Sequence, residues 1–536
     1  MAWACCNAWT ASCRITVDEN VAMKNFLLKL LMDRQPAARR HGAASCVVSK
    51  PSNPRRYHSI ALLESCQAKV GARLSPARRA VNSEDATAVP SPLRCRERNG
   101  AVPCGSWRGR MVTLFVCLLA APLLRADSFL LSNATVNVIS GAALVPGEVL
   151  VRDGKIAAVG TRLAAPGARV IDLRGQQLYP GLIAAGTTLG LTEIAGVRAT
   201  RDSTEVGDYG PDVQSWIAVN PDSELIPVAR ANGITHVEPV PQGGVIAGQS
   251  AVIALDGWTS EQMTMKRPVA LHVFWPEVAL NAAPKSQSRE SSKWKSLDDQ
   301  SRERRQKLRL MEDFFEEARA YAKAKTAAGE KFLIVPAWEA MLPFVRGELP
   351  VIVYANDLRQ IKAALAWAGA GRYRLVIAGG RDAWIVAEAL AAEKVPVIYD
   401  QIFTQPFRDT DPYDLPFKAP SILQKAGVKV VFSHGLSGMQ AATVRNLPYN
   451  AAQAMGFGLP EIEALKGITL YPAQILGVAD RLGSIESGKE ATLFVADGSI
   501  LDIRSHVTQM WIAGHEVSLE SKQTRLYDKY RNRPKP

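Results

Sequence analysis

Cysteine is absent from most of this chain. All eight cysteines lie between Cys5 and Cys117, and none follows Cys117. The body of the protein therefore has neither a disulfide nor a thiolate metal site. The cysteines that precede it share no repeated C-x-x-C spacing, which argues against a zinc-binding module in the amino-terminal stretch.

Net charge is nearly absent from the body as well, although the whole chain carries +13. Residues 1–110 contain 18 Lys and Arg against 7 Asp and Glu, a net charge of +11. The remaining residues contain 46 against 44, a net charge of +2. A nearly neutral body gives no electrostatic reason to expect a nucleic-acid partner.

Long apolar runs are scarce, and the clearest one covers residues 111–126, MVTLFVCLLAAPLLRA. About 14 apolar residues are too few to span a bilayer comfortably, but they suit the apolar core of a signal peptide. Arg108 and Arg110 precede the run, and Ala126 is a small residue at its end. We expect a signal peptide at 111–126, export to the periplasm or the extracellular space, and no stable membrane anchor.

Two accounts of residues 1–110 stay open. Their Arg-, Ala-, Ser- and Pro-rich, aperiodic character favours upstream sequence translated in error, with Met111 as the true start. The alternative is an Arg-rich organelle-targeting leader, although the stretch is long and rich in cysteine for that role. In either case, we expect it to be disordered.

The two ends of the body are rich in short β-type runs. At 127–178, runs such as Phe129–Val138 alternate with Gly and Pro turns, and the Asp153-Gly154 pair predicts a tight hairpin. At 478–520, the runs 491–495 and 507–512 repeat this pattern. Because each end is too short to fold alone, we predict that both form one small composite β-sandwich domain.

Between these ends, at 179–477, helical and strand patterns alternate. Predicted helices at 222–232, 357–368, 382–392 and 421–426 are followed by predicted strands at 234–240, 374–378, 395–399 and 428–432. Repeated βα units of this length predict a parallel sheet, and about 300 residues of them suit a (β/α)₈ TIM barrel. The predicted fold class is therefore α/β, a barrel with an attached β domain.

A charged segment at 285–331 interrupts the alternation. It carries an amphipathic stripe that includes Leu308, Met311, Phe315 and Tyr321. We interpret it as a solvated helical insertion that packs on the barrel through this stripe. A partner-binding arm is the alternative, and self-association of the chain stays open. A basic tail follows at 521–536.

Three motifs resemble those of a known family. Tyr179–Leu191 reads Y-P-G-L-I-A-A-G-T-T-L-G-L, and Gly483–Leu493 reads G-S-I-E-S-G-K-E-A-T-L after Thr469–Ala473, T-L-Y-P-A. They resemble the P-G-(F/L)-I-D-x-H-x-H, G-x-(I/L)-E-x-G-K-x-A-D-L and T-x-N-P-A motifs of the amidohydrolase superfamily, and of its imidazolonepropionase-like and prolidase-like members in particular. The resemblance covers nearly everything after residue 127.

The resemblance implies a chemistry. Members of the family hold one or two divalent metals, often zinc, at the mouth of the barrel. The ligands are the H-x-H pair of strand 1, a carboxylated Lys or a Glu on strand 4, His on strands 5 and 6, and Asp on strand 8. Metal-bound hydroxide attacks an amide-like carbon, so the implied activity is hydrolysis of carbon–nitrogen bonds other than peptide bonds.

This sequence departs from the family at the ligand positions. Gly186 and Thr188 stand where the H-x-H pair is expected, Tyr354 replaces the histidine of strand 5, and Gly379 that of strand 6. The strand 8 region offers His434 and no carboxylate. We therefore predict no bound metal cofactor. Instead, we predict a small-molecule pocket lined by these five residues, with His434 as the candidate catalytic group.

A rebuilt metal site is the alternative. Only five histidines follow residue 127. His236 and Glu238 lie two apart on a predicted strand and therefore on one face, while His272 and Asp400 end other apolar runs. These four residues, with His434, supply imidazole and carboxylate ligands. The competing interpretation is that each is a hydrogen-bonded or surface residue at a strand end.

The Gly-rich stretch 243–250 offers exposed amides that suit an anion, but no Lys-Ser/Thr follows the last glycine as in a phosphate-binding loop. A tight packing loop is the favoured interpretation. The body also lacks a G-x-S-x-G nucleophile motif.

Three functions stay open from sequence. The chain is an exported amidohydrolase-like hydrolase, a catalytically inactive relative that binds a ligand in the barrel, or a scaffold that uses the insertion as a contact surface. Fold resemblance alone does not choose between them, because function lies in the site.

Overall fold

The computed structural model describes residues 128–288, 290, 292–328 and 332–534. The predictions for 1–110 and for the signal peptide at 111–126 fall outside these residues. No helix within the described residues combines the length and the apolar character needed to cross a membrane.

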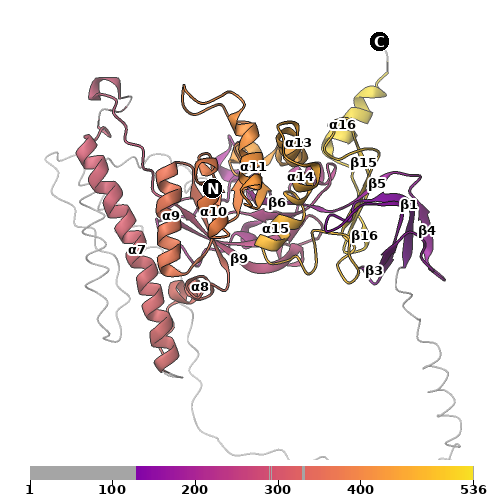
Figure 1. Ribbon diagram of the computed structural model, residues 1–536, viewed down its shortest axis with the longest axis horizontal. Coiled ribbons are helices and arrows are strands. Elements are labelled where there is room, and N and C mark those ends of the chain that lie inside the picture. Colours follow the sequence, from indigo (N-terminus) through magenta and orange to yellow (C-terminus); the bar gives the residue numbers. More distant parts are fainter. Residues whose placement is uncertain (1–127, 289, 291, 329–331, 535–536) are drawn as a thin grey trace, which may run out of the picture. The chain divides into compact units, whose positions relative to one another are not determined.

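The β domain is one eight-stranded sheet built from both ends of the body (Figure 1). Its strands are β1 (Phe129–Val136), β2 (Leu144–Arg152), β3 (Lys155–Gly160), β4 (Arg169–Asp172), β5 (Gln177–Pro180), β14 (Leu493–Ala496), β15 (Val507–Ile512) and β16 (His515–Glu516). Strand β5 pairs antiparallel with β14, with Leu178 opposite Val495. The prediction that both ends of the body share one domain is therefore confirmed.

Local sequence explains how this sheet forms. Asp153 and Gly154 join β2 to β3 with φ angles of 51° and 72°, the positive values that a type I′ hairpin turn requires at both central residues. Phe129 at the start of β1 stacks on Trp511 of β15, with ring centroids 5.7 Å apart. This contact joins β1 to β15 within the buried core of the domain.

The second eight-stranded sheet is the barrel, and its strands follow one another in chain order. They are β6 (Leu182–Thr187), β7 (Ile234–Pro239), β8 (Ile246–Ala254), β9 (Thr264–Phe274), β10 (Pro350–Ala355), β11 (Arg374–Gly379), β12 (Val397–Tyr399) and β13 (Val430–Phe432). The last strand returns to the first, where the Ser433 hydroxyl donates to the Ala185 carbonyl at 2.8 Å and the Thr188 amide donates to the Gly435 carbonyl at 2.8 Å. The predicted TIM-type barrel is confirmed.

One strand departs from the simple βα repeat. Strand β8 runs antiparallel to both of its neighbours, β7 and β9. The segment between Pro239 and Ile246 is too short for the crossover helix that a parallel strand needs. Its glycines allow close backbone approach, because a Cβ on Gly244 would lie 2.6 Å from the Gly207 carbonyl oxygen. This crowding favours the packing-loop interpretation of the Gly-rich stretch.

Helices cover the outside of the barrel (Figure 1). They include α5 (Leu225–Arg230), α6 (Ser260–Met263), α8 (Pro336–Val345), α9 (Leu358–Gly371), α10 (Ala387–Ala392), α11 (Leu415–Lys425), α12 (Gly438–Ala441), α13 (Leu447–Gly456), α14 (Glu461–Lys466) and α15 (Leu470–Ile475). Helix α9 begins at a capping box in which Asp357 and Gln360 satisfy the free amides of the first turn. The basic tail forms α16 (Lys522–Arg531), which buries none of its residues.

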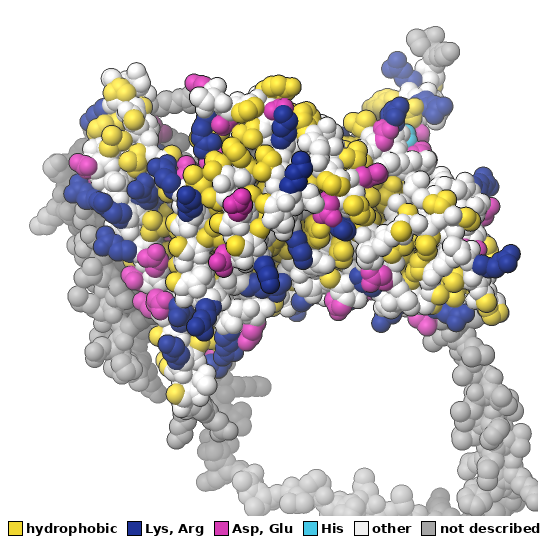
Figure 2. Space-filling model, in the orientation of Figure 1, with side chains coloured by type: hydrophobic (Ala, Val, Ile, Leu, Met, Phe, Trp, Pro, Cys, Tyr) yellow, Lys and Arg dark blue, Asp and Glu magenta, His cyan; other side chains and the backbone are white. Residues whose placement is uncertain are grey.

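The charged insertion forms the long helix α7 (Leu297–Ala328) beside α9 (Figure 1). Its residues Met311, Phe315, Ala318 and Tyr321 are buried, which confirms the predicted packing stripe. Phe315 contacts Trp367 of α9 edge-on, with ring centroids 4.8 Å apart. The outer face of α7 carries interspersed basic and acidic side chains (Figure 2).

Candidate functional site

The inside of the barrel changes from apolar to polar along its axis. Ile183, Ile352, Val376 and Ile398 fill the interior nearer the strand starts. Polar side chains occupy the same interior nearer the carboxyl ends of the parallel strands, where TIM barrels carry their active sites. They are Glu238 of β7, Ser250 of β8, His272 of β9, Tyr354 of β10 and Asp400 directly after β12.

Glu238 lies at the centre of this polar group and is fully buried. The Ser250 hydroxyl donates to its Oε1 at 2.7 Å, and the Gly186 backbone amide donates to its Oε2 at 3.1 Å. Each carboxylate oxygen of Glu238 therefore has a hydrogen-bond donor, which offsets part of the cost of burying this group.

His272 connects Glu238 to Tyr354. Its Nε2 lies 3.4 Å from Glu238 Oε1, within ion-pair distance but without hydrogen-bond alignment. Its Nδ1 lies 3.1 Å from the Tyr354 hydroxyl oxygen. Tyr354 in turn stacks on Phe274, with ring centroids 4.3 Å apart. A carboxylate, an imidazole and a phenol therefore follow one another from the barrel interior to its mouth.

The pKa values of the two acids at the mouth shift upward. Burial raises the pKa of Tyr354 well above its usual range, and the nearby carboxylates of Glu238 and Asp400 raise it further. Burial also raises the pKa of Asp400 from its ordinary value of 3.8, against a smaller opposing effect of hydrogen bonds, including one from the Gln401 side chain. Tyr354 therefore stays a neutral phenol, and Asp400 stays protonated to higher pH than an ordinary aspartate.

The remaining predicted pocket residues are held by separate contacts. The Thr188 hydroxyl donates to the Gly435 carbonyl at 3.1 Å. His434 Nε2 lies 3.0 Å from the Thr443 hydroxyl. Gly379 faces Asn356, whose Oδ1 would lie 2.6 Å from a Cβ at this position. Thr188, Gly379 and His434 therefore contact neighbours outside the polar group, whereas Gly186 reaches Tyr354 indirectly through Glu238 and His272.

The structure brings three of the four residues of the alternative metal site into the polar group and leaves the fourth, His236, outside it. Glu238 and His272 approach each other, and Asp400 acts electrostatically on Tyr354. His236 is buried among other neighbours, where its Nδ1 lies 3.1 Å from the Thr235 hydroxyl and burial, with a smaller effect of the Arg481 charge, lowers its pKa to about 3. In the described part of the chain, no three His, Cys, Asp or Glu side chains gather in a group suited to hold a metal ion.

Sequence reasoning missed Ser250 as a site residue. The polar alternation Gln249-Ser250 follows the Gly-rich loop, but an antiparallel β8 was not predicted, so no pattern placed Ser250 beside Glu238. The Ser250–Glu238 contact is a cross-strand pairing that depends on the hairpin between β7 and β8.

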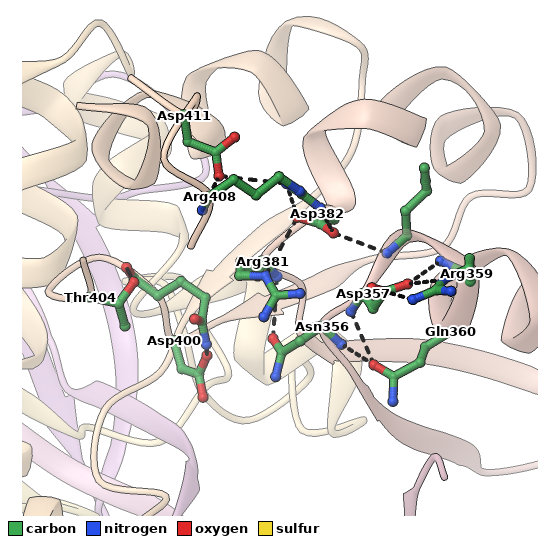
Figure 3. A network of polar contacts seen from close by, with 12 residues as sticks. Asn356, Asp357, Arg359, Gln360, Arg381, Asp382, Asp400, Thr404, Arg408 and Asp411 are labelled. Carbon is green, nitrogen blue, oxygen red and sulfur yellow. Dashed lines mark hydrogen bonds and ion pairs between the residues drawn. The ribbon is translucent and has the colours of Figure 1, made fainter. Parts of the chain in front are cut away.

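A network of charged residues next to Asp400 was missed as well (Figure 3). It centres on Asp382, which follows β11 and whose side chain is 1% exposed. Arg408 binds both carboxylate oxygens of Asp382, at 3.1 Å and 2.5 Å. The Leu358 amide donates to Asp382 Oδ2 at 3.1 Å. These contacts tie the ends of β10 and β11 to the segment 400–414.

Segment 400–414 connects β12 to α11 and begins at the site residue Asp400. The Arg381 guanidinium lies 3.5 Å from the ring centroid of Phe407, which packs the segment on the end of β11. Arg408 also approaches Asp411 at 3.5 Å (Figure 3). The charged network therefore fixes the chain that follows Asp400 and limits the positions that the Asp400 carboxyl can take.

The fold and the site define a TIM-type barrel with a composite β domain and a polar group at its mouth. Comparisons with known proteins show which family has this architecture. A family model described as Amidohydrolase family matches residues 417–518. The crystal structure of an amidohydrolase from Thermotoga maritima MSB8 is 29% identical, covers 73% of this chain and 99% of its own, and has a TM-score of 0.64. The chain belongs to the amidohydrolase superfamily.

A curated relative is much longer than the matched region. Amidohydrolase tasK of Hapsidospora irregularis is 22% identical over 408 residues, which are 69% of this chain and 39% of the relative. The chain thus spans well under half the length of this relative.

Proposed function

We propose that this protein is an exported hydrolase that cleaves a carbon–nitrogen bond, other than a peptide bond, in a small amide or cyclic amide. The reaction takes place at the barrel mouth and does not use the binuclear metal centre of the family. The single observation that carries the proposal is the contact chain from Glu238 through His272 to Tyr354, next to Asp400, whose pKa is raised by burial.

The donor set argues against the family's metals. Two cations need several imidazole or anionic ligands that converge on them. The positions of the usual ligands hold Gly186, Thr188, Tyr354 and Gly379, of which glycine has no side chain and the Thr188 hydroxyl is already bonded to a carbonyl. Glu238 and His272 supply two strong donors, but Glu238 is satisfied by Ser250 and Gly186. The residues present therefore do not fit a binuclear zinc site.

The chain of three residues suits a general base. Glu238 as a carboxylate favours a proton on Nε2 of His272, so that Nδ1 accepts the Tyr354 hydroxyl proton. Water that adds to the carbonyl carbon gives a proton to the Tyr354 oxygen while Tyr354 passes its own proton to His272. The Glu238 charge then offsets the imidazolium that forms.

Asp400 suits the general acid. Burial raises its pKa, which favours the protonated carboxyl, and the proton of that form passes to the leaving nitrogen as the C–N bond breaks. Return of the His272 proton to the Asp400 carboxylate through solvent restores the site. One water is consumed, and a carboxylic acid and an amine are released.

The alternative is a catalytically inactive member that binds a ligand in the same mouth. It is favoured by the complete burial of Glu238 and His272, which keeps both from direct substrate contact. The two functions share a small-molecule partner, and they differ in whether the bound molecule is cleaved.

The test is hydrolysis of a panel of N-acyl amino acids, hydantoins and aryl amides, with the released amine measured by chromatography and with EDTA present or absent. We expect turnover that EDTA does not abolish and that falls about 100-fold or more in Tyr354→Phe. The matched control is Tyr413→Phe, since Tyr413 is 77% exposed. Chelator-sensitive turnover contradicts the metal-free mechanism, and binding of a panel member without turnover supports the inactive alternative.

The pH profile gives a second test. Asp400 acts as an acid, so activity falls as pH rises through its pKa, which lies above the ordinary 3.8. Asp400→Asn should remove this alkaline limb together with most of the activity. If the residual activity of Asp400→Asn still falls at high pH, then another group causes this fall, and Asp400 is not the general acid.

Export rests on the apolar run at 111–126. We expect amino-terminal sequencing of the mature native protein to begin near Asp127. A mature protein that retains residues before Met111 contradicts this part of the proposal.

A further inference from the structure

A cavity lies at the end of the barrel opposite the polar group, where β11, β12 and β13 begin. It has a volume of about 300 Å³ and lies between these strand starts and the helices α10 and α15. We call it the basal cavity. Its walls are mainly apolar and include Leu375, Leu390, Val395 and Ile475. This volume is at the lower end of the range for sites that hold small organic ligands.

Three basic residues line the basal cavity, and its described lining contains no acidic residue. They are Arg374 at the start of β11, Lys394 before β12 and Lys429 before β13. No carboxylate lies within 4 Å of any of these three cations in the described part of the chain, although other Lys and Arg side chains form such pairs. The cavity therefore combines an apolar wall with a surplus of positive charge.

Two of the cations are fixed by one residue of α15. The Lys429 Nζ donates to the Gln474 side-chain oxygen at 2.8 Å. An Arg374 Nη donates to the Gln474 backbone carbonyl at 3.5 Å. Neutral acceptors hold these side chains in place and leave their charges unbalanced. Lys394 follows α10 and has an exposed side chain, so it is accessible to an anion from solvent.

We propose that the basal cavity binds a small amphipathic carboxylate. The carboxylate lies among Arg374, Lys394 and Lys429, and its apolar body lies against the wall that Leu390 and Val395 supply. An inorganic anion would leave this wall without a contact, and a neutral ligand would leave the three cations without an anionic partner. The site lies at the strand starts, apart from the polar group at the barrel mouth.

The experiment is isothermal titration calorimetry of the purified full-length protein with octanoate, octanol and inorganic phosphate. We expect octanoate to bind at least about tenfold more tightly than either of the others, because only octanoate matches both parts of the cavity. If octanol binds as tightly as octanoate, then the cations do not contribute to binding. If phosphate binds as tightly, then the apolar wall does not contribute. Either result overturns the proposal. Absence of octanoate binding overturns it as well.

Variants locate the site. Lys394→Gln combined with Lys429→Gln should weaken octanoate binding by about tenfold or more, since charged hydrogen bonds are lost. Ala391→Phe keeps all three charges and fills the cavity, so it should weaken binding to a similar extent. The charge control is Lys362→Gln on the exposed face of α9, which should leave binding unchanged.

Two further measurements keep the result interpretable. Circular dichroism of each variant shows whether it is folded, and only folded variants enter the comparison. Tyr354→Phe should bind octanoate as tightly as the parent chain. Loss of octanoate binding in Tyr354→Phe would place octanoate at the barrel mouth and overturn the proposal. The hydrolase proposal is tested separately by the substrate panel, so the two proposals can fail independently.

Discussion

Neighbouring groups decide what each buried ionisable residue does. Glu238 has a hydrogen-bond donor at each carboxylate oxygen, whereas burial is the main influence on Asp400 at the mouth and raises its pKa. The sequence identified Glu238, His272 and Asp400 as polar residues at strand ends. It could not pair them, because contacts across a barrel depend on strand register and not on spacing along the chain.

His236 makes stability depend on pH. Its pKa is lowered from 6.5 to about 3 by burial, so below pH 6.5 the unfolded chain gains a proton that the folded chain does not. Stability therefore falls as pH falls from 6.5 to about 3, by about 1.4 kcal/mol per pH unit. Between pH 7 and pH 5, urea unfolding should show about 2 kcal/mol more loss in the parent chain than in His236→Gln.

The control for this prediction is His515→Gln, because His515 is exposed in β16. It should keep the full pH dependence of the parent chain. If His236→Gln loses as much stability between pH 7 and pH 5 as the parent does, then His236 is not buried in its neutral form.

Arg408 stabilises the segment that follows Asp400. Its removal in Arg408→Met leaves the buried Asp382 with the Leu358 amide and with Arg381, whose Nε lies 3.5 Å away. Because those partners remain and Arg408 is itself 37% exposed, we expect a loss of about 1–3 kcal/mol in the free energy of unfolding.

Urea denaturation measures this loss, and Arg504→Met is the matched control. Arg504 pairs with Asp502 at 2.6 Å, but its side chain is 86% exposed, so its removal should cost less than about 1 kcal/mol. Equal effects of the two substitutions would show that the Asp382 pair is no more important than a surface pair.

At the scale of elements, the predictions succeeded where a periodic pattern extended over a whole element. The predicted strand 507–512 matches β15, and the predicted helix 357–368 lies within one residue of the start of α9. Helix α11 begins at Leu415, six residues before the predicted start at 421. The prediction began after Pro420, but the helix contains Pro416 in its first turn and Pro420 in its interior. Proline tolerated in a helix is a tertiary effect that a local pattern does not reveal.

Strand β8 is the clearest miss. Its residues Ile246–Ala254 form a continuous buried run, which gives no information on direction. The short loop that precedes it settles the direction, since only an antiparallel partner is within reach. Loop length, rather than strand composition, was the signal available in the sequence.

Helix α7 is held to the barrel by its apolar stripe. Phe315 is fully buried and contacts Trp367 and Tyr373, with ring centroids 4.8 Å and 5.2 Å away. Phe315→Ala should cost about 3–5 kcal/mol and expose α7 to limited proteolysis. Leu310→Ala is the control, since Leu310 is 48% exposed, and it should change stability by less than about 0.5 kcal/mol. Unchanged protease resistance in Phe315→Ala would show that other contacts hold the helix.

At the scale of the whole molecule, the fold followed from the sequence and the site did so only in part. The β-rich ends and the βα alternation predicted the barrel and its composite domain, because these patterns reflect burial along each element. Five residues were predicted to line one pocket, and of these Tyr354 belongs to the polar group at the mouth while Gly186 supplies an amide to Glu238. The others are held by neighbours from the βα loops, which sequence spacing does not specify.

The metal content of the purified protein tests the central claim most directly. The chain should be produced with zinc and manganese supplied, purified without chelator and measured by elemental analysis. Since the usual ligand positions hold Gly186, Thr188, Tyr354 and Gly379, we predict no stoichiometric zinc or manganese. The account would be contradicted if the protein bound one or two equivalents of metal and lost them in His272→Ala or His434→Ala. That result would indicate the metal-dependent chemistry of the family.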